Sequence, residues 1–447
     1  MSVKAANFQT SSLARLPQGA LVRSVLAAAI QAVEPANAIH QHLRRVEKHL
    51  LVAGRKYDLT SYSRIACLAI GKAAAAMSAA VAEILGERLT ESLVVSKQAL
   101  LKGEQATSGR FQAIQGGHPV PDANSVQAGE YALQLCRSLS EEDLLICLIS
   151  GGGSALLTCP ADGIVLADMQ ALTTLLLASG ARIDEINTLR RHLDLVKGGG
   201  IARAAAPAQV ISLILSDVVN SPLEAIASGP TAADPSSRQE ALDVLAKYNL
   251  INKVAPAILQ TLKNGAETLK PGDAFLERVQ NVLVGDNRLA ALAAGAAAQS
   301  GGLQVIQLGN NWQGEAREVA VRVCSYLQTN NGRGICWIAG GETTVTLHGK
   351  GKGGRNQELA LAAVDLLAGL PDVMLVTLAT DGEDGPTDAA GAVVTGETHA
   401  RAHALGLEAD NYLGNNDAYH YFEKLGDLLK PGPSGTNVND LTFMFRF

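Results

Sequence analysis

The pattern of apolar and polar positions alternates between two periods from Arg64 to Asp217. Short apolar runs bounded by glycine or polar residues are typical of buried strands, and longer stretches with apolar residues three or four positions apart are typical of helices. The pattern predicts strands over 64–70, 92–96, 111–115, 143–150 and 209–217, and helices over 21–33, 71–85, 123–139, 166–179 and 183–196. Because strands and helices alternate, we expect a doubly wound α/β domain whose parallel sheet binds ligands at the carboxyl ends of its strands.

A polar segment containing prolines, residues 228–240, predicts a domain boundary. Beyond it, the same patterns predict strands over 279–285, 303–309, 334–341, 344–349, 373–382 and 441–447, and helices over 289–299, 314–328, 357–370 and 397–405. We therefore expect residues 1–20 to be a leader or a disordered tail, 21–240 to form the first domain, and 241–447 to form a second α/β domain.

The composition narrows the class of protein. Of the 447 residues 47% are hydrophobic and 18% charged, which excludes a mainly disordered chain, and the formal charge of −6 gives no reason to expect nucleic acid or an anionic membrane as partner. No apolar run reaches the roughly 18 residues of a membrane span.

The six cysteines lack zinc-site spacing and favour a reducing compartment such as the cytoplasm. A mitochondrial location is the alternative, because the first 33 residues are free of acids. The oligomeric state is open, with a homodimer as one alternative.

Three adjacent glycines interrupt two apolar runs in "LISGGGSALL", residues 148–157. This is either a tight turn from strand to helix or a loop whose backbone N–H groups contact an anion. The residues that would make such a contact are Ser150, Gly151, Gly152, Gly153 and Ser154. A second loop, "LVKGGGIA", contains Lys197 and also fits the end of a helix.

A third glycine loop, "HGKGKGGRNQELA" (residues 348–360), places three cations just before a predicted helix. Basic side chains, free amides and a helix N-terminus favour a phosphate or carboxylate site. The match to GxGxxG is a weak dinucleotide signal, since the acid expected about 20 residues further on is missing. The chain has no GxxxxGK[ST] and is therefore not a P-loop enzyme.

Polar residues follow several predicted strands. Asp217, Glu342 and Asp381 each come just after an apolar run, where a carboxylate can cap a turn, bind Mg²⁺ or act as a base. Lys72 stands where the strand 64–70 turns into a helix, and His118 fits a loop better than a catalytic base. The polar clusters "NND" (415–417) and "GTNVND" (435–440) fit turns or a binding site.

These motifs together resemble the glycerate 2-kinases of the MOFRL type over about residues 20–447. The similar blocks are "LISGGGSALL", "INTLRRHLDLVKGGGIA", "LILSDVVNSPLEAIASGPT", "GGETTVTLHGKGKGGRNQELAL", "ATDGEDGPTDAAGA" and "GTNVNDL". The resemblance implies a Rossmann-like N-terminal domain, a C-terminal MOFRL domain and an active site in the cleft between them, where Lys72 and Arg355 match the family's basic residues. It also implies transfer of the ATP γ-phosphate to the 2-hydroxyl of D-glycerate.

The remaining roles are assigned from chemistry. We expect Lys72, Arg355 and Asp217 to be catalytic, and Asp217 and Asp381 to bind Mg²⁺. The residues expected to bind ATP or glycerate are Ser150, Gly151, Gly152, Gly153, Ser154, Lys197, Gly341, Glu342, Gly353, Gly354, Asn356, Asp381, Asn416, Asp417 and Asn437. Two alternatives remain: a hydroxypyruvate reductase, against which the missing dinucleotide fingerprint speaks, and a non-catalytic module that binds a sugar phosphate.

Overall fold

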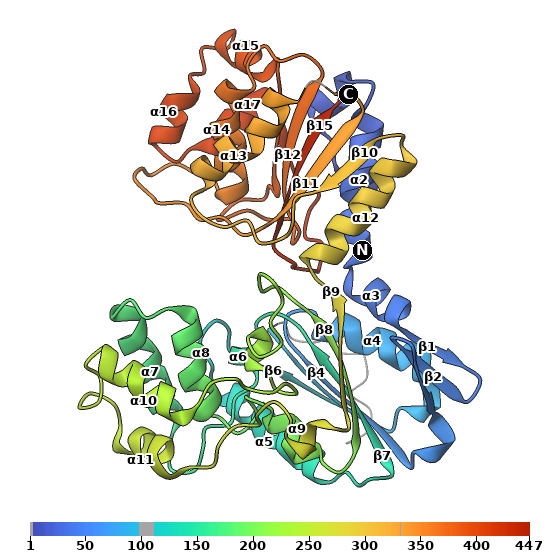
Figure 1. The fold of residues 1–447 in the computed structure, drawn as a ribbon, viewed down its shortest axis with the longest axis vertical. Helices are drawn as coiled ribbons and strands as arrows, with labels where there is room; N and C mark the ends of the chain where they lie inside the picture. The colour runs from blue at the N-terminus through green and yellow to red at the C-terminus, as the bar shows by residue number, and fades with distance from the viewer. Residues whose placement is uncertain (1–2, 98–110, 331) are drawn as a thin grey trace. The chain divides into compact units, whose positions relative to one another are not determined.

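A computed structural model describes residues 3–97, 111–330 and 332–447, and it divides the chain into two compact units (Figure 1). Unit 1 consists of residues 1–37, 217–220 and 285–447. Unit 2 consists of residues 38–216 and 221–284. Each unit has its own six-stranded sheet.

The sheet of unit 2 has the strand order β6-β5-β4-β7-β8-β9. Its strands are β4 (Arg64–Ile70), β5 (Glu91–Ser96), β6 (Phe111–Gln115), β7 (Asp143–Ile149), β8 (Gln209–Leu215) and β9 (Val279–Gly285). Neighbouring strands from β6 to β8 run parallel. Every residue of the central strand β7 is buried, as expected for a parallel strand covered on both faces. The predicted doubly wound domain is confirmed.

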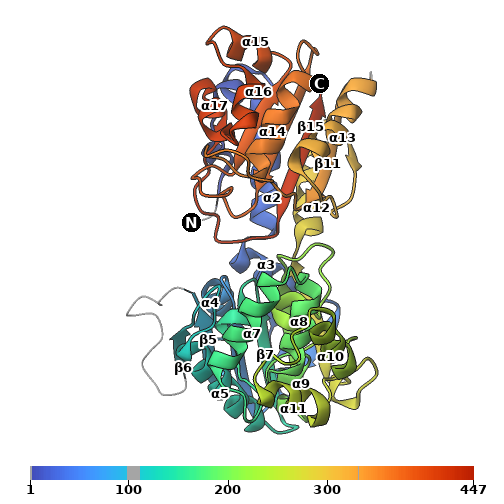
Figure 2. The same cartoon turned by 90° about the vertical axis from the view of Figure 1, so that its left-hand side faces the viewer.

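Helices cover this sheet and form a separate group beside it. The helices are α4 (Ala74–Leu85), α5 (Ala123–Arg137), α6 (Gly153–Leu156), α7 (Leu166–Ala178), α8 (Ile183–His192), α9 (Gly200–Ala205), α10 (Arg238–Lys247) and α11 (Pro256–Asn264). Helices α7, α8, α10 and α11 share one apolar core (Figure 2). An antiparallel meander of β1 (Leu43–Val46), β2 (His49–Val52) and β3 (Arg55–Asp58) was not predicted from the sequence.

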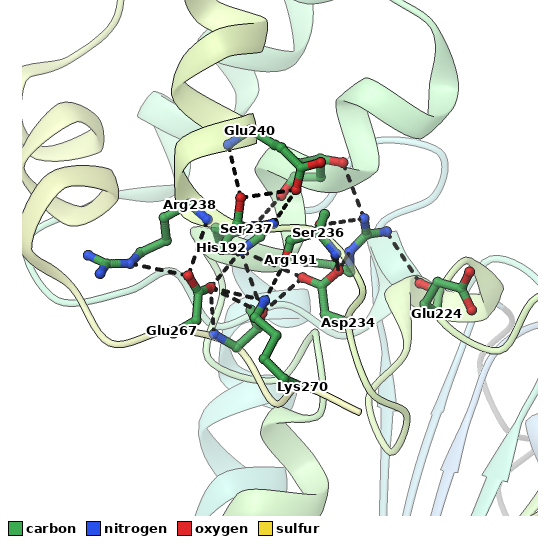
Figure 3. A network of polar contacts seen from close by, with 12 residues as sticks. Arg191, His192, Glu224, Asp234, Ser236, Ser237, Arg238, Glu240, Glu267 and Lys270 are labelled. Carbon is green, nitrogen blue, oxygen red and sulfur yellow. Dashed lines mark hydrogen bonds and ion pairs between the residues drawn. The ribbon is translucent and has the colours of Figure 1, made fainter. Parts of the chain in front are cut away.

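The segment expected to be a domain boundary, residues 228–240, instead lies inside unit 2. Asp234, whose side chain has no exposed surface, forms an ion pair with Nε of Arg191 at 2.8 Å and accepts the hydroxyl of Thr268 at 3.0 Å. His192 and Glu267 belong to the same network (Figure 3). The division of the chain therefore differs from the expected boundary at residues 240 and 241, because the polar residues of this segment form a buried ion network and not a solvated linker.

The sheet of unit 1 is mixed and has the order β10-β11-β15-β12-β13-β14. Its strands are β10 (Gln304–Gln307), β11 (Ile335–Gly341), β12 (Val373–Ala379), β13 (Gly391–Thr395), β14 (Leu428–Leu429) and β15 (Asp440–Arg446). The last strand, β15, lies between β11 and β12 and is antiparallel to both. The ends of β11 and β12 and the start of β15 therefore meet at one edge.

Helices cover both faces of this sheet (Figure 1). On one face α13 (Ala316–Thr329) and α14 (Arg355–Leu366) share an apolar core with α17 (Ala418–Leu425). The other face is covered by α12 (Asn287–Ser300), which packs against α2 (Gly19–Ala32). The smaller helices are α15 (Thr398–His403) and α16 (Ala409–Gly414). The predicted α/β fold class of the second domain is thus confirmed.

The N-terminal residues belong to unit 1. Helix α1 (Ser11–Arg15) is fixed by Ser12, whose backbone N–H and hydroxyl donate to the buried carboxylate of Asp427 at 2.8 and 2.9 Å. Arg401 donates to the same carboxylate at 2.6 Å. Phe8 is fully buried. The expectation of a disordered tail is therefore wrong for residues 3–20.

One predicted strand is also wrong. Residues 344–349 are irregular, apart from a single bridge between Thr344 and Glu315. Of the cysteines, Cys67, Cys147 and Cys336 are buried in strands. Among the described residues, none of the helices combines the length and apolar character that crossing a bilayer requires.

Candidate functional site

In unit 2, the carboxyl ends of β4 and β7 bring Lys72 beside the glycine loop 150–154. The backbone N–H of Lys72 donates to the carbonyl of Gly151 at 2.9 Å, and the hydroxyl of Ser150 accepts the N–H of Ala73 at 3.1 Å. This contact follows from the parallel pairing of β4 with β7, because adjacent parallel strands end at the same edge. The Lys72 side chain is exposed there.

Gly152 is in the left-handed region, with φ of 83°, and the side chains of Lys72 and His118 border the space where a side chain would be. A Cβ there would lie 3.0 Å from the His118 ring and 3.5 Å from Cγ of Lys72. The backbone N–H groups of Gly151 and Gly152 have no acceptor within the described part of the chain. Lys72, His118 and the loop 150–154, here named the Lys72 cluster, can therefore offer a cation and unused amides to an anion.

This environment disfavours the charged form of His118. Partial burial, together with the positive charges of Lys72 and Lys97, lowers the pKa of His118 below its usual value. Its Nδ1 is buried and has no partner among the described residues. Ser154, at the far end of the loop, shares a hydrogen bond of 2.8 Å with Ser228.

Lys197, expected at the site, is instead paired within unit 2. Its Nζ lies 2.5 Å from a carboxylate oxygen of Asp194 and 3.0 Å from the carbonyl of Leu157. Burial lowers the pKa of Lys197, and the charge of Asp194 opposes this shift. With its side chain 2% exposed, Lys197 holds the second glycine loop in place.

In unit 1, Arg355 begins α14 and forms ion pairs with two carboxylates. Its Nε lies 2.5 Å from Oδ2 of Asp440, and its Nη1 lies 2.8 Å from Oε1 of Glu342. Asn439 donates from Nδ2 to Oε2 of Glu342 at 2.9 Å and to the backbone carbonyl of Asp217 at 2.8 Å. These residues, here named the Arg355 cluster, gather where β11 ends and β15 begins.

The charges of the Arg355 cluster shift one another. Burial raises the pKa of Glu342; Arg355 opposes this shift, and Asp440 and Asp217 add to it. Burial alone would lower the pKa of Arg355, but the hydrogen bond and charge of Asp440 and the charge of Glu342 raise it. Burial and the charge of Asp440 likewise raise the pKa of Asp381. A cation beside Asp381 would therefore be favourable.

In the first part of the third glycine loop, residues 348–352, the backbone amides are hydrogen-bonded by the chain itself. Asn416 accepts the N–H groups of His348 and Gly349 at 2.8 and 3.0 Å, and Asp417 accepts that of Lys352 at 2.9 Å. A Cβ on Gly349 would lie 2.3 Å from the carbonyl oxygen of Asn415. The glycines of this part of the loop are thus required for packing, and its amides are not free to bind a ligand.

The N-terminus of α14 is also occupied. The carboxylate of Asp384 accepts the backbone N–H of Asn356 at 3.2 Å and that of Gln357 at 2.9 Å. Burial raises the pKa of Asp384 to about 6, although these hydrogen bonds oppose the shift. A Cβ on Gly354 would lie 2.3 Å from the Asp384 carboxyl carbon. An anion therefore does not have these two amides available.

The three cations of the loop do not converge. Nζ of Lys352 lies 4.0 Å from the centre of the Tyr419 ring, and Lys350 is exposed. Arg355 alone of the three lines a pocket of about 620 Å³ in unit 1, here named the Arg355 pocket. Gly353, Gly354, Glu342 and Asn416 line it as well. The N–H groups of Gly353 and Gly354 have no acceptor among the described residues.

Three further expected residues, Gly341, Asn437 and Asp381, also lie in unit 1. A Cβ on Gly341 would lie 2.0 Å from the carbonyl oxygen of Trp312, so this glycine permits close packing. Asn437 accepts the N–H of Asn439 at 3.0 Å. Asp381 accepts the N–H of Glu383 at 3.2 Å.

Sequence reasoning missed Asp440 and Asn439 as partners of Arg355 and Glu342. The signal was present in the polar cluster that precedes the last strand, but their contacts with Arg355 and Glu342 span 85 and 97 residues of sequence. Only the central position of β15 in the sheet reveals them.

The chain is similar to known protein families and to proteins with assigned names. Residues 21–263 match a domain of unknown function, DUF4147, and residues 335–440 match the MOFRL family. The chain is 38% identical over 429 residues to a D-glycerate 2-kinase of Thermotoga maritima, covering 94% of this chain and 96% of that protein. It is 38% identical over 387 residues to a putative hydroxypyruvate reductase of Agrobacterium vitis, covering 85% of this chain and 86% of that protein.

Two solved structures are also similar to this chain. A crystal structure of glycerate kinase from Thermotoga maritima matches with a TM-score of 0.85 and 36% identity, covering 96% of this chain and 99% of that one. A crystal structure of a Pyrococcus horikoshii protein matches with a TM-score of 0.86 and 36% identity, covering 95% and 97%.

Proposed function

The chain belongs to the glycerate kinase family, and from this we propose that it transfers the γ-phosphate of ATP to the 2-hydroxyl of D-glycerate, yielding 2-phospho-D-glycerate and ADP. The observation that carries the proposal is identity of 38% that extends over 96% of a D-glycerate 2-kinase. A shared domain alone would support only a shared fold. Lys72 lies within residues 21–263, which match DUF4147, and Arg355 lies within residues 335–440, which match the MOFRL family.

The Lys72 cluster supplies a cation and free amides in this proposal. Phosphoryl transfer needs charge stabilisation on the moving group and exact positioning of its oxygens, with little covalent help from the protein. The exposed ammonium of Lys72 and the unused N–H groups of Gly151 and Gly152 suit a phosphate or the glycerate carboxylate. In its uncharged form, which the lowered pKa favours, His118 beside them can accept or donate a hydrogen bond without adding charge.

The Arg355 cluster supplies a second cation, a guanidinium whose orientation is fixed. Two carboxylates hold the guanidinium through Nε, Nη1 and Nη2, so little reorganisation is needed when charge develops on a nearby oxygen. Glu342, whose pKa is raised, is the carboxylate we assign to orient the acceptor hydroxyl. Asp217 contributes its backbone carbonyl to the Asn439 contact that holds Glu342.

Mg²⁺ is the metal ion we propose to accompany ATP, and Asp381 and Asp217 are the candidate ligands. Mg²⁺ in phosphoryl-transfer enzymes is commonly bound by one or two carboxylates together with substrate phosphates. The elevated pKa of Asp381 fits a carboxylate that a cation would stabilise. The ion would neutralise phosphate charge. Within the described residues no group of three or more His, Cys, Asp or Glu is arranged for a metal.

The compartment and the oligomeric state remain proposals. We propose a cytoplasmic location, which the six free cysteines support. A homodimer would be recognised by light scattering of the purified protein.

Two parallel assays test the proposed reaction. The protein is mixed with D-glycerate, ATP and Mg²⁺, and ADP release is followed; in the second assay it is mixed with hydroxypyruvate and NADH or NADPH. We expect ADP release that depends on glycerate and no oxidation of the reduced nucleotide. Oxidation without ADP release would instead favour the reductase activity named for the Agrobacterium vitis relative.

A further inference from the structure

One wall of the Arg355 pocket is apolar and open to solvent. Leu347 is 77% exposed, more than any other large apolar side chain among the described residues. Single exposed leucines are ordinary on protein surfaces. Here, however, Val345 and Pro386 line the same pocket. Together they offer an apolar surface to a flat ligand.

The charged groups of the pocket are already paired. Glu342 is paired with Arg355 at 2.8 Å, and Glu358 accepts Nε of Arg317 at 2.6 Å. Asp384 is occupied by backbone N–H groups of α14. Carboxylates therefore outnumber cations in the lining, and they would repel a polyphosphate lying within the pocket. Such a lining suits an uncharged ligand group that carries hydrogen-bonding atoms.

The size of the pocket also favours a ligand with a large uncharged part. Its volume of about 620 Å³ lies in the range of pockets that hold cofactors and drug-sized ligands, and far exceeds what a three-carbon acid needs. The unused N–H groups of Gly353 and Gly354 line the same pocket, next to Arg355. A ligand with a large uncharged part and an attached phosphate would match all of these groups.

We propose that the Arg355 pocket binds the nucleoside part of ATP, with the purine against Leu347 and Val345. This inference rests on the proposed kinase function, which makes ATP the relevant nucleotide. It assigns to unit 1 the recognition of the base and ribose, with Gly353, Gly354 and Arg355 left to contact a phosphate.

Binding of ADP and of inorganic tripolyphosphate, measured by calorimetry, tests the assignment. Leu347→Ser removes the apolar contact without adding charge, and the folding of the protein should not change because the side chain is exposed. We expect the dissociation constant for ADP to rise about tenfold, as for loss of one apolar side chain contact, while tripolyphosphate binding stays unchanged. Leu405→Ser is the matched control, since Leu405 is 58% exposed in unit 1 and does not line the pocket.

Other results would overturn the assignment. These are an unchanged ADP affinity in Leu347→Ser, an equal loss in Leu405→Ser, or an equal loss of tripolyphosphate binding. The wild-type protein is assayed for phosphoglycerate in the same preparation. If it makes product while Leu347→Ser binds ADP normally, only the pocket assignment fails; if it neither binds ADP nor makes product, the kinase proposal fails as well.

Discussion

Asp440 holds the guanidinium of Arg355 with both carboxylate oxygens, Oδ2 at 2.5 Å from Nε and Oδ1 at 3.2 Å from Nη2. Two donors in one plane facing two acceptors fix the rotation of the guanidinium as well as its position. The third contact, from Nη1 to Glu342, fixes the remaining side of the group. The Arg355 side chain is one-third exposed, so it is held and yet reachable.

Replacing Arg355 tests whether this geometry matters for catalysis. Lysine keeps the charge but cannot make the forked contact, so Arg355→Lys should lower kcat nearly as much as Arg355→Ala, by about 10²–10⁴-fold. Steady-state kinetics with glycerate and ATP measure it. The control is Arg333→Lys, which alters an exposed ion pair with Asp372 in the same unit and should keep normal turnover. Full activity in Arg355→Lys would mean that only the charge is required.

Gly152→Val should abolish activity and leave the protein folded. A β-branched residue is strained at φ of 83°, and its side chain would meet His118 and Lys72. Gly163→Val is the matched control, because Gly163 has φ of 81° in the same unit and nothing within 4 Å of a built Cβ. Circular dichroism monitors folding. Equal activity losses in the two variants would trace the effect to backbone strain and not to the Lys72 cluster.

Lys72→Met should raise the pKa of His118 and also lower kcat by about 10²–10⁴-fold. Removing a neighbouring positive charge makes it easier to protonate the imidazole, since Lys72 contributes to lowering that pKa. Titration of the His118 ring by NMR measures the shift. Lys56→Met, which removes an exposed lysine of β3, should leave the His118 pKa where it is. An unchanged His118 pKa in Lys72→Met would contradict the effect of the Lys72 charge on His118 described above.

Asp384 should make unit 1 less stable as the pH rises. The pKa of this buried carboxyl is raised from 3.8 to about 6, so the folded protein holds the proton more tightly than the unfolded chain. Its contribution to stability is full below the unfolded pKa and is lost as the pH rises through about 6. The free energy of unfolding of the wild type minus that of Asp384→Asn should therefore shrink between about pH 4 and about pH 7. Urea titrations at the two pH values measure this difference in the free energy of unfolding. A difference that grows with pH would contradict the prediction.

Much of the fold follows from local patterns. The central parallel strands β4 and β7 of unit 2 are short and apolar after their first residue, and β6 and β9 have the residues that the pattern predicts. Contacts between distant segments were not predictable. Helix α2 joins unit 1 because it packs on α12, where Leu21 occupies the space beside Gly301, and nothing in the local sequence reveals that choice.

The candidate site was predictable in its residue types but not in its contacts. The sequence showed that Arg355 follows glycines just before a predicted helix, and that Lys72 follows a glycine at the end of a predicted strand. The occupation of the loop amides by Asn416 and Asp417 was not, because these residues lie 65 or more positions from the amides they bind. For the same reason the sequence could not show that Lys352, which contacts the Tyr419 ring, is placed differently from Arg355, which lines the pocket.

Phosphorus NMR of the product formed from D-glycerate, ATP and Mg²⁺ tests the central claim most directly. Splitting of the phosphorus signal by the neighbouring protons distinguishes an ester at the 2-hydroxyl, which has one such proton, from an ester at the 3-hydroxyl, which has a pair. The account predicts 2-phosphoglycerate together with an equal amount of ADP. A 3-phosphate, or no phosphorylated product from a folded protein, would contradict it.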